Sequence, residues 1–572
     1  MLSIRHFRGV SRLDWFPSGA PLCCLIGAGD SGKSTVLDAV EAALSSKWFA
    51  FSEADFFGCD TGTEIQIDVT IGELSRSILS DERFGLYVRG WSATGAINDE
   101  PEDGDLPVLT VRLTVDATME PVWQLVCDRA ETPRILSNRD RSLFGLVRLA
   151  GDDPRHLTWG QGSVLARLTE DNDDAARHLA DAYRSARTSA NLGGISALKK
   201  ASADAEKLAR SFGAYVEGSY GPGLELTRGG FSSGSIALHD SDVPLRLAGL
   251  GTRRFATLAI QRASINEGAI VLVDEIEHGL EPHRIMGAIA QMKAAQHEAD
   301  EQRIATGQIL MTTHSDVAIG ELKPGSLFVV RRDRRSKETE IRRPSEPAVL
   351  AKLMKKSPRA LFAERVLVCE GVTEVGLMLG LRELFPANHA DVPIEQKGAA
   401  LADGNGAEAP QLALALAALG YPVAMFRDSD RALTADQKSR LAAAGVTVFQ
   451  YVGDMDTESA LLTVASLARV EELLEVAREE KGRDAVNASI RAKIPNLSPE
   501  TLNSTVGSWS LLDDVSDEDI RQALVALSVS MSWFKKLQVG RKIAPIVWSI
   551  VCEAPASPLA ACLRNVEGWL YA

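Results

Sequence analysis

The segment LCCLIGAGDSGKST, residues 22–35, decides the fold of the first half of the chain. Its apolar beginning predicts a buried strand, and the sequence from Lys33 onward predicts a helix. Between them, Gly27 to Ser34 fits GxxxxGK[ST] at every fixed position. Backbone N–H groups of such a loop surround phosphates, and the helix N-terminus favours an anion. The segment therefore predicts a site for nucleotide phosphates.

The side chains of this loop predict how ATP and its magnesium ion are held. Lys33 reaches the β- and γ-phosphate oxygens, and Ser34 offers a hydroxyl to Mg²⁺. A glycine-rich turn without function is the alternative, which the flanking strand and helix disfavour. The residues of this loop predicted to bind ATP are Gly27, Asp30, Gly32, Lys33, Ser34 and Thr35.

A second apolar run, AIVLVDE at 269–275, ends in two carboxylates. At the end of a buried strand, Asp274 can bind Mg²⁺ and Glu275 can polarise the attacking water as a general base. Acidic pairs at strand ends are often merely solvated, but this pair accompanies a complete P-loop. The two segments together predict ATP hydrolysis.

The order of motifs in the first half resembles the ABC-type ATPase head of SMC and recombination ATPases. After the P-loop come LAGLGTRRFATLAI (247–260), VLVDE (271–275), HGLEP (278–282) and MTTHS (311–315). The resemblance implies that the backbone N–H of Gly251 faces the γ-phosphate of a partner subunit, and that His314 is a switch histidine. The signature loop departs from the family pattern, because an Ala-Gly-Leu-Gly series stands where a serine is usual. The resemblance also implies a homodimer, or a higher homo-oligomer, assembled through the heads. Gln66 fits either a Q-loop or a plain exposed strand position.

A second set of acids follows two later apolar runs, RVLVCEGVTE (365–374) and VAMFRDSD (423–430). In a parallel sheet the ends of both strands meet at the carboxyl edge, so Glu370, Glu374, Asp428 and Asp430 should converge there. Converging carboxylates repel one another unless cations lie between them, and an all-oxygen set suits Mg²⁺ or Mn²⁺. The pattern predicts a site for divalent metal ions.

This EGxxE and DxD pair resembles the Toprim domain of topoisomerases, primases and OLD-family nucleases. The seven scattered cysteines form no CxxC pair that could serve a primase zinc module, and no tyrosine stands in a defensible topoisomerase segment. An ABC head followed by Toprim resembles the OLD (overcoming lysogenization defect) family, which includes the nuclease subunit of the Gabija antiphage system.

The OLD resemblance implies a two-metal DNA nuclease. Glu370, Asp428 and Asp430 would hold one ion, and Glu374 with a later acid would hold the other. Asp454, Asp456 and Glu458 are candidates for that acid, and Glu458 is preferred. The family also places a basic residue near the C-terminus; the candidates are Lys535, Lys536, Arg541 and Lys542, of which Lys536 enters the predicted catalytic set. A solvated helix face is the alternative for these four.

The chain has a net charge of −15, which counts against a uniformly basic nucleic-acid binder. Residues 331–359, however, contain eleven basic and four acidic residues, a local net charge of +7. A solvated linker or hairpin is the alternative to the DNA-facing surface that we favour. Neither a secretory signal nor 18 uninterrupted apolar residues are present, so a cytoplasmic protein without a membrane partner is expected.

The predicted fold class is α/β, with an ABC-type P-loop head, a helical insertion, a Toprim domain and a helical C-terminal region. The expected ranges are an N-lobe at 1–165, a helical arm at 166–230, a C-lobe at 231–345, Toprim at 346–465 and the helical remainder at 466–572. The leading functional hypothesis is an ATP-regulated DNA endonuclease or nickase in phage defence or DNA repair, with room for a helicase-type partner protein. The alternatives are an ATP-dependent DNA clamp without nuclease activity and, last, a transporter ATPase subunit.

Overall fold

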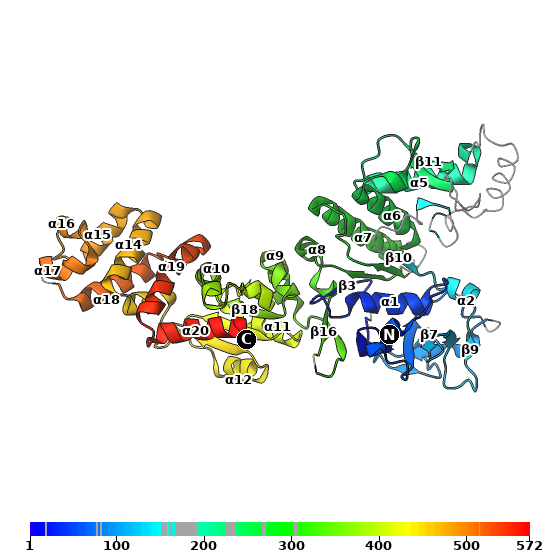
Figure 1. Ribbon diagram of the computed structural model, residues 1–572, viewed down its shortest axis with the longest axis horizontal. Helices are drawn as coiled ribbons and strands as arrows, with labels where there is room; N and C mark the ends of the chain where they lie inside the picture. The colour runs from blue at the N-terminus through cyan, green and yellow to red at the C-terminus, as the bar shows by residue number, and fades with distance from the viewer. Residues whose placement is uncertain are drawn as a thin grey trace. The chain divides into compact units, whose positions relative to one another are not determined.

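The computed structural model describes the whole chain except residues 18–19, 76–77, 81–82, 150–156, 160–162, 164, 166–191, 225–235, 266–269, 303–306, 334 and 514. The chain divides into two compact units, residues 1–343 and 344–572 (Figure 1). Most of the predicted helical arm, residues 166–191, lies outside the described residues.

The first unit begins with an antiparallel sheet. Strands β1 (Leu2–Phe7), β2 (Val10–Trp15), β4 (Ile65–Ile71) and β7 (Leu106–Val115) lie in the order β2-β1-β4-β7, continued by the short β5 (Arg89–Trp91) and β6 (Ile97–Asn98). Strands β8 (Pro121–Leu125) and β9 (Arg134–Ile135) extend it beside β7. Residues 63–74 and 107–116 alternate apolar and polar side chains, and they form β4 and most of β7, while the polar, Gly- and Asp-rich segment 90–105 contains β6 and the end of β5.

A second sheet of six strands carries the P-loop. Its order is β10 (Val147–Leu149), β14 (Val271–Val273), β15 (Ile309–Thr312), β3 (Leu22–Ile26), β16 (Leu327–Arg332) and β17 (Thr339–Arg342). All neighbours are parallel except β16 and β17. Every residue of β3, β14 and β15 is buried, as expected for strands covered on both faces. The carboxyl ends of β3, β15 and β14 therefore meet at one edge of the sheet.

Helices tie these sheets together. Helix α1 (Lys33–Leu44) contacts β1, β4 and β7 of the antiparallel sheet and β15 of the parallel sheet, through a buried face that includes Val36, Leu37 and Val40. Helix α6 (Leu250–Ile265) contacts α7 (Pro282–Gln302) and α5 (Ser196–Ser211). Strands β11 (Tyr220–Leu224), β12 (Ile236–Asp240) and β13 (Val243–Pro244) form a small sheet, so the boundary expected at residue 230 falls between two paired strands.

The second unit contains a four-stranded, fully parallel sheet. Its order is β19 (Ala399–Asp403), β18 (Arg365–Cys369), β20 (Val423–Arg427) and β21 (Thr447–Gln450). Helices α9 (Pro347–Lys356), α10 (Val372–Leu381), α11 (Ala409–Ala418) and α12 (Ala435–Ala443) accompany the strands. Helices and strands thus alternate through residues 364–452.

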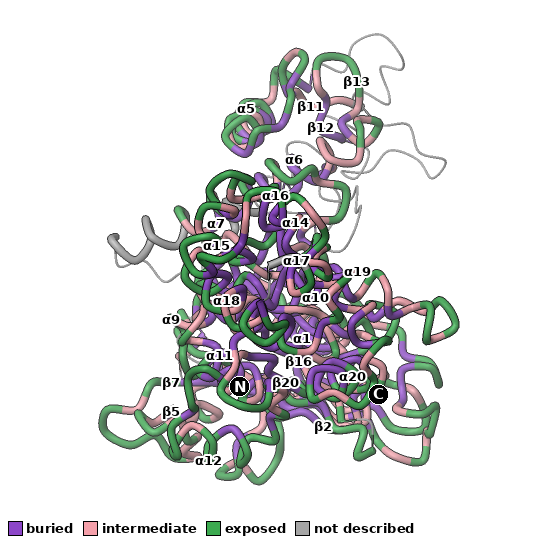
Figure 2. Tube along the Cα trace, turned by 90° about the vertical axis from the view of Figure 1, so that its left-hand side faces the viewer, coloured by how far each residue is buried: buried purple, intermediate pink, exposed green. Residues whose placement is uncertain are grey.

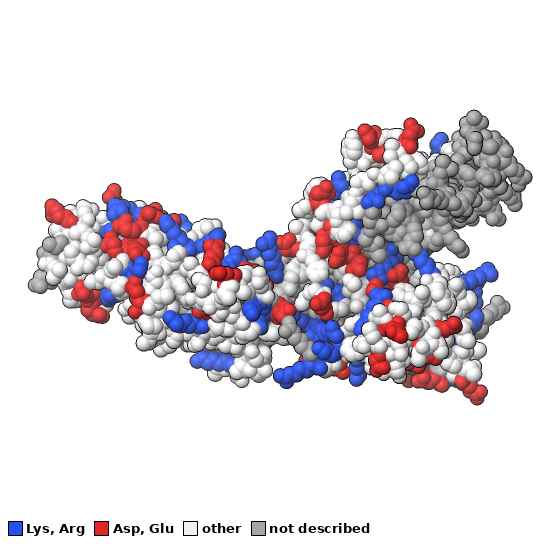
Figure 3. Space-filling model, viewed as in Figure 1, with Lys and Arg blue, Asp and Glu red and all other residues white. Residues whose placement is uncertain are grey.

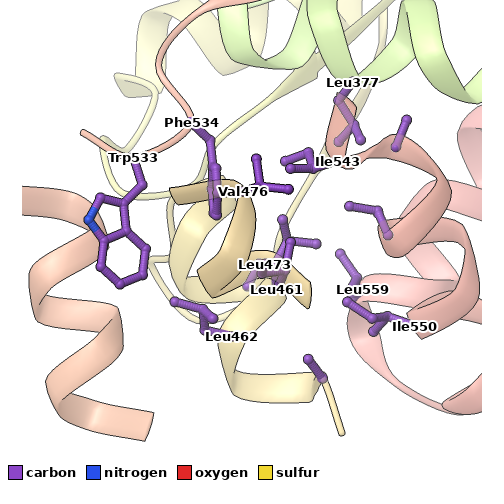
Figure 4. Packing of buried hydrophobic residues seen from close by; sticks show 14 of the residues in the cluster. Leu377, Leu461, Leu462, Leu473, Val476, Trp533, Phe534, Ile543, Ile550 and Leu559 are labelled. Atoms are coloured by element: carbon purple, nitrogen blue, oxygen red, sulfur yellow. The ribbon is translucent and has the colours of Figure 1, made fainter. Parts of the chain in front are cut away.

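The remainder of this unit is helical, as predicted. It contains α13 (Thr457–Val464), α14 (Leu467–Lys481), α15 (Arg483–Lys493), α16 (Pro499–Leu502), α17 (Trp509–Asp513), α18 (Asp517–Ser530), α19 (Leu537–Glu553) and α20 (Pro558–Tyr571). Figure 4 shows Leu461 of α13 and Leu473 of α14 in one apolar core with Ile543 of α19. The same core includes Leu377 of α10, so the helical region and the Toprim-like part share it. Figure 2 shows the buried segments in purple and the exposed ones in green.

Helices α10 and α19 approach each other very closely. A Cβ atom on Gly376 would lie 2.2 Å from the carbonyl oxygen of Leu537, and one on Gly380 would lie 2.3 Å from the Cβ of Ala544. On the opposite helix, a Cβ on Gly540 would lie 2.7 Å from the carbonyl oxygen of Thr373. The three glycines are therefore required by the contact between the two helix backbones.

No single helix in the described part of the chain is long and apolar enough to cross a membrane. Helices α19 and α20 meet that test only when they are counted together, although they are bent by 111° at their junction. The predicted fold class, an α/β ATPase head followed by a Toprim domain and a helical region, is confirmed.

Candidate functional site

The P-loop lies between β3 and α1, and two of its glycines have backbone angles that disfavour other residues. Gly27 has φ +149°, and a Cβ there would lie 2.4 Å from the carbonyl oxygen of Val330. Gly32 has φ +97° and lies directly before α1. The side chain of Lys33 is folded over the loop, where its ammonium donates to the carbonyl oxygens of Gly27 (3.1 Å) and Ala28 (2.7 Å). Burial lowers the pKa of Lys33, and the charge of Asp274 opposes this shift.

Asp274 follows β14, and its carboxylate accepts hydrogen bonds from three side chains. The hydroxyl of Ser34 lies 3.2 Å from its Oδ1, as the predicted pairing of P-loop and metal-binding acid requires. Thr312, at the end of β15, donates to the same oxygen at 2.7 Å. Arg148 of β10 lies 3.2 Å from Oδ2. Thr312 and Arg148 were missed in the sequence, where neither stands in a recognisable nucleotide-binding position.

Glu275 is held by its backbone. Its φ of +46° is a left-handed conformation that non-glycine residues rarely adopt, and such strain often accumulates at functional positions. Its N–H donates to the hydroxyl of Thr312 at 2.8 Å. The guanidinium of Arg254, in α6, donates to the carbonyl oxygens of Asp274 (2.7 Å) and Glu275 (2.5 Å). The half-exposed Glu275 carboxylate thus projects from a fixed backbone at the edge of the sheet.

His314 follows β15 at the same edge. Its backbone N–H donates to Glu277 Oε1 at 2.6 Å, and the hydroxyl of Thr313 donates to Glu277 Oε2 at 2.6 Å. The residue itself is exposed. The structure therefore brings the P-loop, Asp274, Glu275 and His314 to one edge of the same sheet.

The segment containing Gly251 packs against the segment 278–282. A Cβ on Gly251 would lie 2.9 Å from the carbonyl oxygen of Gly279, and a Cβ on Gly279 would lie 2.5 Å from Leu250 Cδ2. Gly251 lies in the first turn of α6, where backbone N–H groups have no acceptor within the helix. Gln66 instead lies inside β4 and donates to Asp68 at 3.1 Å, which fits the plain strand position.

The second site lies at the carboxyl edge of the sheet in the other unit. Glu370 follows β18 and Asp428 follows β20, while Glu374 lies in the first turn of α10 and accepts from the Gly371 N–H at 2.9 Å. The hydroxyl of Thr457 lies 3.0 Å from Glu374 Oε1 and 2.9 Å from Asp428 Oδ1. Because one hydroxyl carries one proton, it cannot donate to both carboxylates at once. A proton on one of the two acids, or a cation between them, is needed to relieve the repulsion between the carboxylates of Glu374 and Asp428.

Burial makes the charged forms of these acids unfavourable. Burial, followed by the charge of Glu374, raises the pKa of Asp428 to about 8. Burial also raises the pKa of Glu374, and it raises the pKa of Glu458 to about 7. Glu458 lies in the first turn of α13, is only 1% exposed, and its Oε1 has no hydrogen-bond partner. Burial therefore distinguishes these three acids from ordinary solvated carboxylates at strand ends.

The remaining predicted acids are placed differently. Asp430 is exposed. Asp456 caps α13 by accepting from the Ser459 N–H, so its oxygen is already used locally. Among the described residues, no three acidic, histidine or cysteine side chains stand close enough to form a complete cation cage. The unpartnered oxygen of Glu458 and the shared hydroxyl of Thr457 nevertheless fit a hard divalent cation bound by oxygen.

A buried guanidinium beside these acids was missed in the sequence. Arg427 is 4% exposed and lies 3.3 Å from Glu370 Oε2, while its other nitrogens donate to the Arg431 carbonyl oxygen at 2.6 Å and to Gln450 at 3.5 Å. The only feature of the sequence that could have indicated a role for Arg427 is its position directly before the DxD motif.

The C-terminal basic residues separate into two groups. The predicted Lys536 lies 3.3 Å from Glu480 and is exposed, and Arg541 and Lys542 pair with Glu383 and Glu479. Lys535 is close enough to Glu458 for its charge to oppose the rise in the pKa of that acid. The charge of Lys535 therefore acts on a buried acid, whereas the ammonium of Lys536 pairs with Glu480.

The basic run 331–359 is divided between the two units. Arg331, Arg332, Lys337 and Arg342 belong to the β16–β17 hairpin, while Arg334 lies outside the described residues; Figure 3 shows blue side chains gathered on this hairpin. In the second unit, α9 carries Lys352, Lys355 and Lys356.

Helix α9 is connected to the acidic site through one loop. Lys352 pairs with Glu408 at 2.6 Å, and Lys356 pairs with Asp403 at 3.3 Å. The same loop donates from the Gly406 N–H to the Glu370 carbonyl oxygen at 2.6 Å. The lysines of α9 therefore lie at the carboxyl edge of the sheet.

Comparisons with known proteins agree with this division. Residues 152–320, which include Asp274, Glu275 and His314, match a family described as "AAA domain, putative AbiEii toxin, Type IV TA system". Residues 361–430, which include Glu370, Glu374, Asp428 and Asp430, match "Overcoming lysogenization defect protein-like, TOPRIM domain". No curated protein is similar enough to count as a match.

Two solved structures are similar to part of the chain. One is an SmcHead bound to the C-winged helix domain of ScpA, with 15% identity and a TM-score of 0.34, covering 60% of this chain and 95% of that one. The other is an Smc head domain with an extended coiled coil, bound to the C-terminal domain of ScpA derived from Pyrococcus furiosus; it has 13% identity and a TM-score of 0.34 and covers 60% of this chain and 94% of that one. The chain thus contains an AAA-type ATPase domain followed by an OLD-like Toprim domain.

Proposed function

We propose that this protein is an ATP-hydrolysing DNA nuclease that cuts or nicks DNA with divalent metal ions at its Toprim site. The observation that carries the proposal is the arrangement around Thr457. One hydroxyl lies between Glu374 and Asp428, and the buried Glu458 presents an oxygen without a partner. Such a set is unfavourable as bare anions, and it is well suited to binding Mg²⁺ or Mn²⁺.

In the ATPase head, the chain's own residues divide the chemistry. Lys33 would exchange the carbonyl oxygens of Gly27 and Ala28 for the phosphates of ATP. Ser34 and Asp274, already 3.2 Å apart, would hold the magnesium ion of the nucleotide. Glu275 would accept a proton from the attacking water, with its backbone fixed by Thr312 and Arg254. His314 and Gly251 of a second copy would complete the γ-phosphate contacts in a head-to-head homodimer or a larger homo-oligomer.

In the Toprim domain, Glu370, Asp428 and Asp430 would hold one metal ion, and Glu374 and Glu458 a second. Bound ions of this kind activate water and stabilise the leaving oxygen of a phosphodiester. Arg427 would keep Glu370 oriented, since it lies 3.3 Å from Oε2 and leaves the other oxygen for a ligand. Lys535 would neutralise charge that develops on the phosphate.

DNA would reach these acids along α9. Lys352, Lys355 and Lys356 present positive charge at the carboxyl edge, where phosphates can replace the pairings with Glu408 and Asp403. Backbone contacts of this kind give affinity without sequence selection. Phage defence and DNA repair both suit such an activity, and a helicase-type partner is compatible with it.

The test uses supercoiled plasmid and the full-length protein, with Mg²⁺ or Mn²⁺ and with or without ATP. We expect nicked or linear product from the wild type, loss of product for Asp428→Ala, and loss of ATP hydrolysis but not of folding for Lys33→Ala. Intact ATP hydrolysis without cleavage under any metal would contradict the nuclease and support the alternative, an ATP-dependent DNA clamp. Equal cleavage by Asp428→Ala and wild type would show that the acids have been assigned wrongly.

A further inference from the structure

Arg148 makes an ion-pair network at the nucleotide site that no motif accounts for. It stands in the middle of β10, where its backbone pairs with Leu272, two residues before Asp274. Its side chain is only 10% exposed and contacts three carboxylates: Asp38, Glu41 at 2.8 Å and Asp274 at 3.2 Å. Arg148 is mostly buried and pairs with three acids, as a buried charge requires, because charges are rarely buried unless they are paired.

The three acids differ in what they do. Asp38 and Glu41 lie on α1, one and two turns beyond the P-loop Ser34. Asp274 is the acid expected to help hold magnesium. Arg148 contacts its Oδ2, while Ser34 and Thr312 contact its Oδ1. One oxygen of the metal-binding carboxylate is therefore engaged by a cation that belongs to the protein.

A second guanidinium, that of Arg8, extends this network, because it pairs with Asp38 and, at 2.8 Å, with Asp55. The charge of Asp274 also acts on Lys33 of the P-loop. Asp274 thus interacts with two cations of the protein, and Arg148 is the one that contacts Oδ2.

We propose that Arg148 is an internal counter-ion that occupies the Asp274 carboxylate in the nucleotide-free head and yields it when Mg–ATP binds. Arg148 then remains with Asp38 and Glu41, which need not move. Magnesium must compete with a guanidinium for Asp274, so Arg148 sets the magnesium concentration at which the head binds ATP. Arg148 is in this sense a positioning residue, and the inference rests on the proposed ATP-binding role of the P-loop.

The test measures binding of a fluorescent, non-hydrolysable ATP analogue to the full chain at increasing MgCl₂. In Arg148→Gln the competing charge is gone while Ser34 and Thr312 still hold Asp274. We expect the half-saturating magnesium concentration to fall about tenfold, equivalent to about 1.4 kcal/mol. Arg148→Lys, which keeps the charge, should return it towards the wild-type value.

Arg8→Gln is the matched control, because Arg8 shares Asp38 with Arg148 but does not contact Asp274. Its magnesium midpoint should move far less than that of Arg148→Gln, because the contact between Arg148 and Asp274 is kept. Glu41→Gln removes an anchor that draws Arg148 away from Asp274, so it should shift the magnesium midpoint upward. This second variant carries the test if Arg148→Gln does not fold.

The possible failures are distinct. A wild type that binds no nucleotide, like Lys33→Ala, would overturn the proposed ATPase function. Nucleotide binding by the wild type with an unchanged midpoint in folded Arg148→Gln would overturn the role of Arg148 alone. An equal shift in Arg8→Gln would also overturn it, because the effect would then be one of general charge.

Discussion

Replacing Asp428 by Asn should stabilise the metal-free protein at alkaline pH while abolishing cleavage. Burial raises the pKa of Asp428 from 3.8 to about 8, so the folded state favours the protonated acid. The unfolded chain ionises near pH 4, and the folded state therefore becomes penalised as the pH rises from about 4 to about 8. Asn removes this penalty because it has no charge to bury.

The magnitude follows from the size of the shift. Each pKa unit corresponds to about 1.4 kcal/mol, so a shift of about four units sets an upper bound of about 6 kcal/mol. Part of the penalty reflects repulsion from Glu374, which remains, and Asn also weakens the bond from Thr457. We expect a net gain of about 2 kcal/mol above pH 8, which for a unit of this size raises Tm by about 4–8 °C.

The assay is a thermal melt of the second unit's transition in EDTA, at several pH values between 5 and 9. The gain should be much smaller near pH 5 than at pH 8 and should grow to a plateau above pH 8. Asp430→Asn is the control, since Asp430 is exposed and therefore has little burial penalty to lose. If Asp428→Asn destabilises the protein at pH 8, or if its gain does not grow with pH, the reasoning about the buried acids is refuted.

Three further outcomes follow from the second unit. Lys535→Ala should reduce cleavage at least tenfold and Lys536→Ala should leave it within about twofold, because Lys535 acts on the charge of Glu458 whereas Lys536 pairs with Glu480; equal losses in plasmid nicking would contradict this. Gly540→Ala should lower the free energy of unfolding of the second unit by about 2–3 kcal/mol, measured by urea denaturation, since the new Cβ meets the α10 backbone. Gly568→Ala is the control and should not lower it, because no atom lies within 4 Å of the added Cβ. Arg427→Met should lower kcat for cleavage and change its dependence on Mn²⁺ concentration, because Glu370 loses its partner. Arg427→Lys should restore part of kcat and part of the metal dependence. Wild-type metal dependence in Arg427→Met would argue against an orienting role for Arg427.

The two sites differed in how much of them the sequence could predict. The P-loop, the Asp274–Glu275 pair and the DxD motif are continuous segments at strand ends, where the apolar run and the motif reinforce each other. Their meeting at one sheet edge follows from the parallel order of the strands. The preference for Glu458 among three acids agrees with its burial, since Asp456 is used as a helix cap.

The residues that sequence analysis missed act through tertiary contacts. Thr457, Arg148 and Arg427 are 83, 126 and 57 residues from the partners Glu374, Asp274 and Glu370. No local periodicity encodes such pairs.

The glycine-mediated contact between α10 and α19 makes the Toprim sheet and the C-terminal helices one cooperative folding unit. Glu374 belongs to α10, and α19 begins two residues after Lys535, so the same contact fixes the spacing between the acids and the base. A chain cut after residue 465 would lose α19 and expose the apolar face of α10, including Leu377. The positions of the proposed metal-binding acids therefore depend on the C-terminal helices as much as on the motifs. A change in α10 or in α19 at the glycine contact would require a compensating change in the other helix.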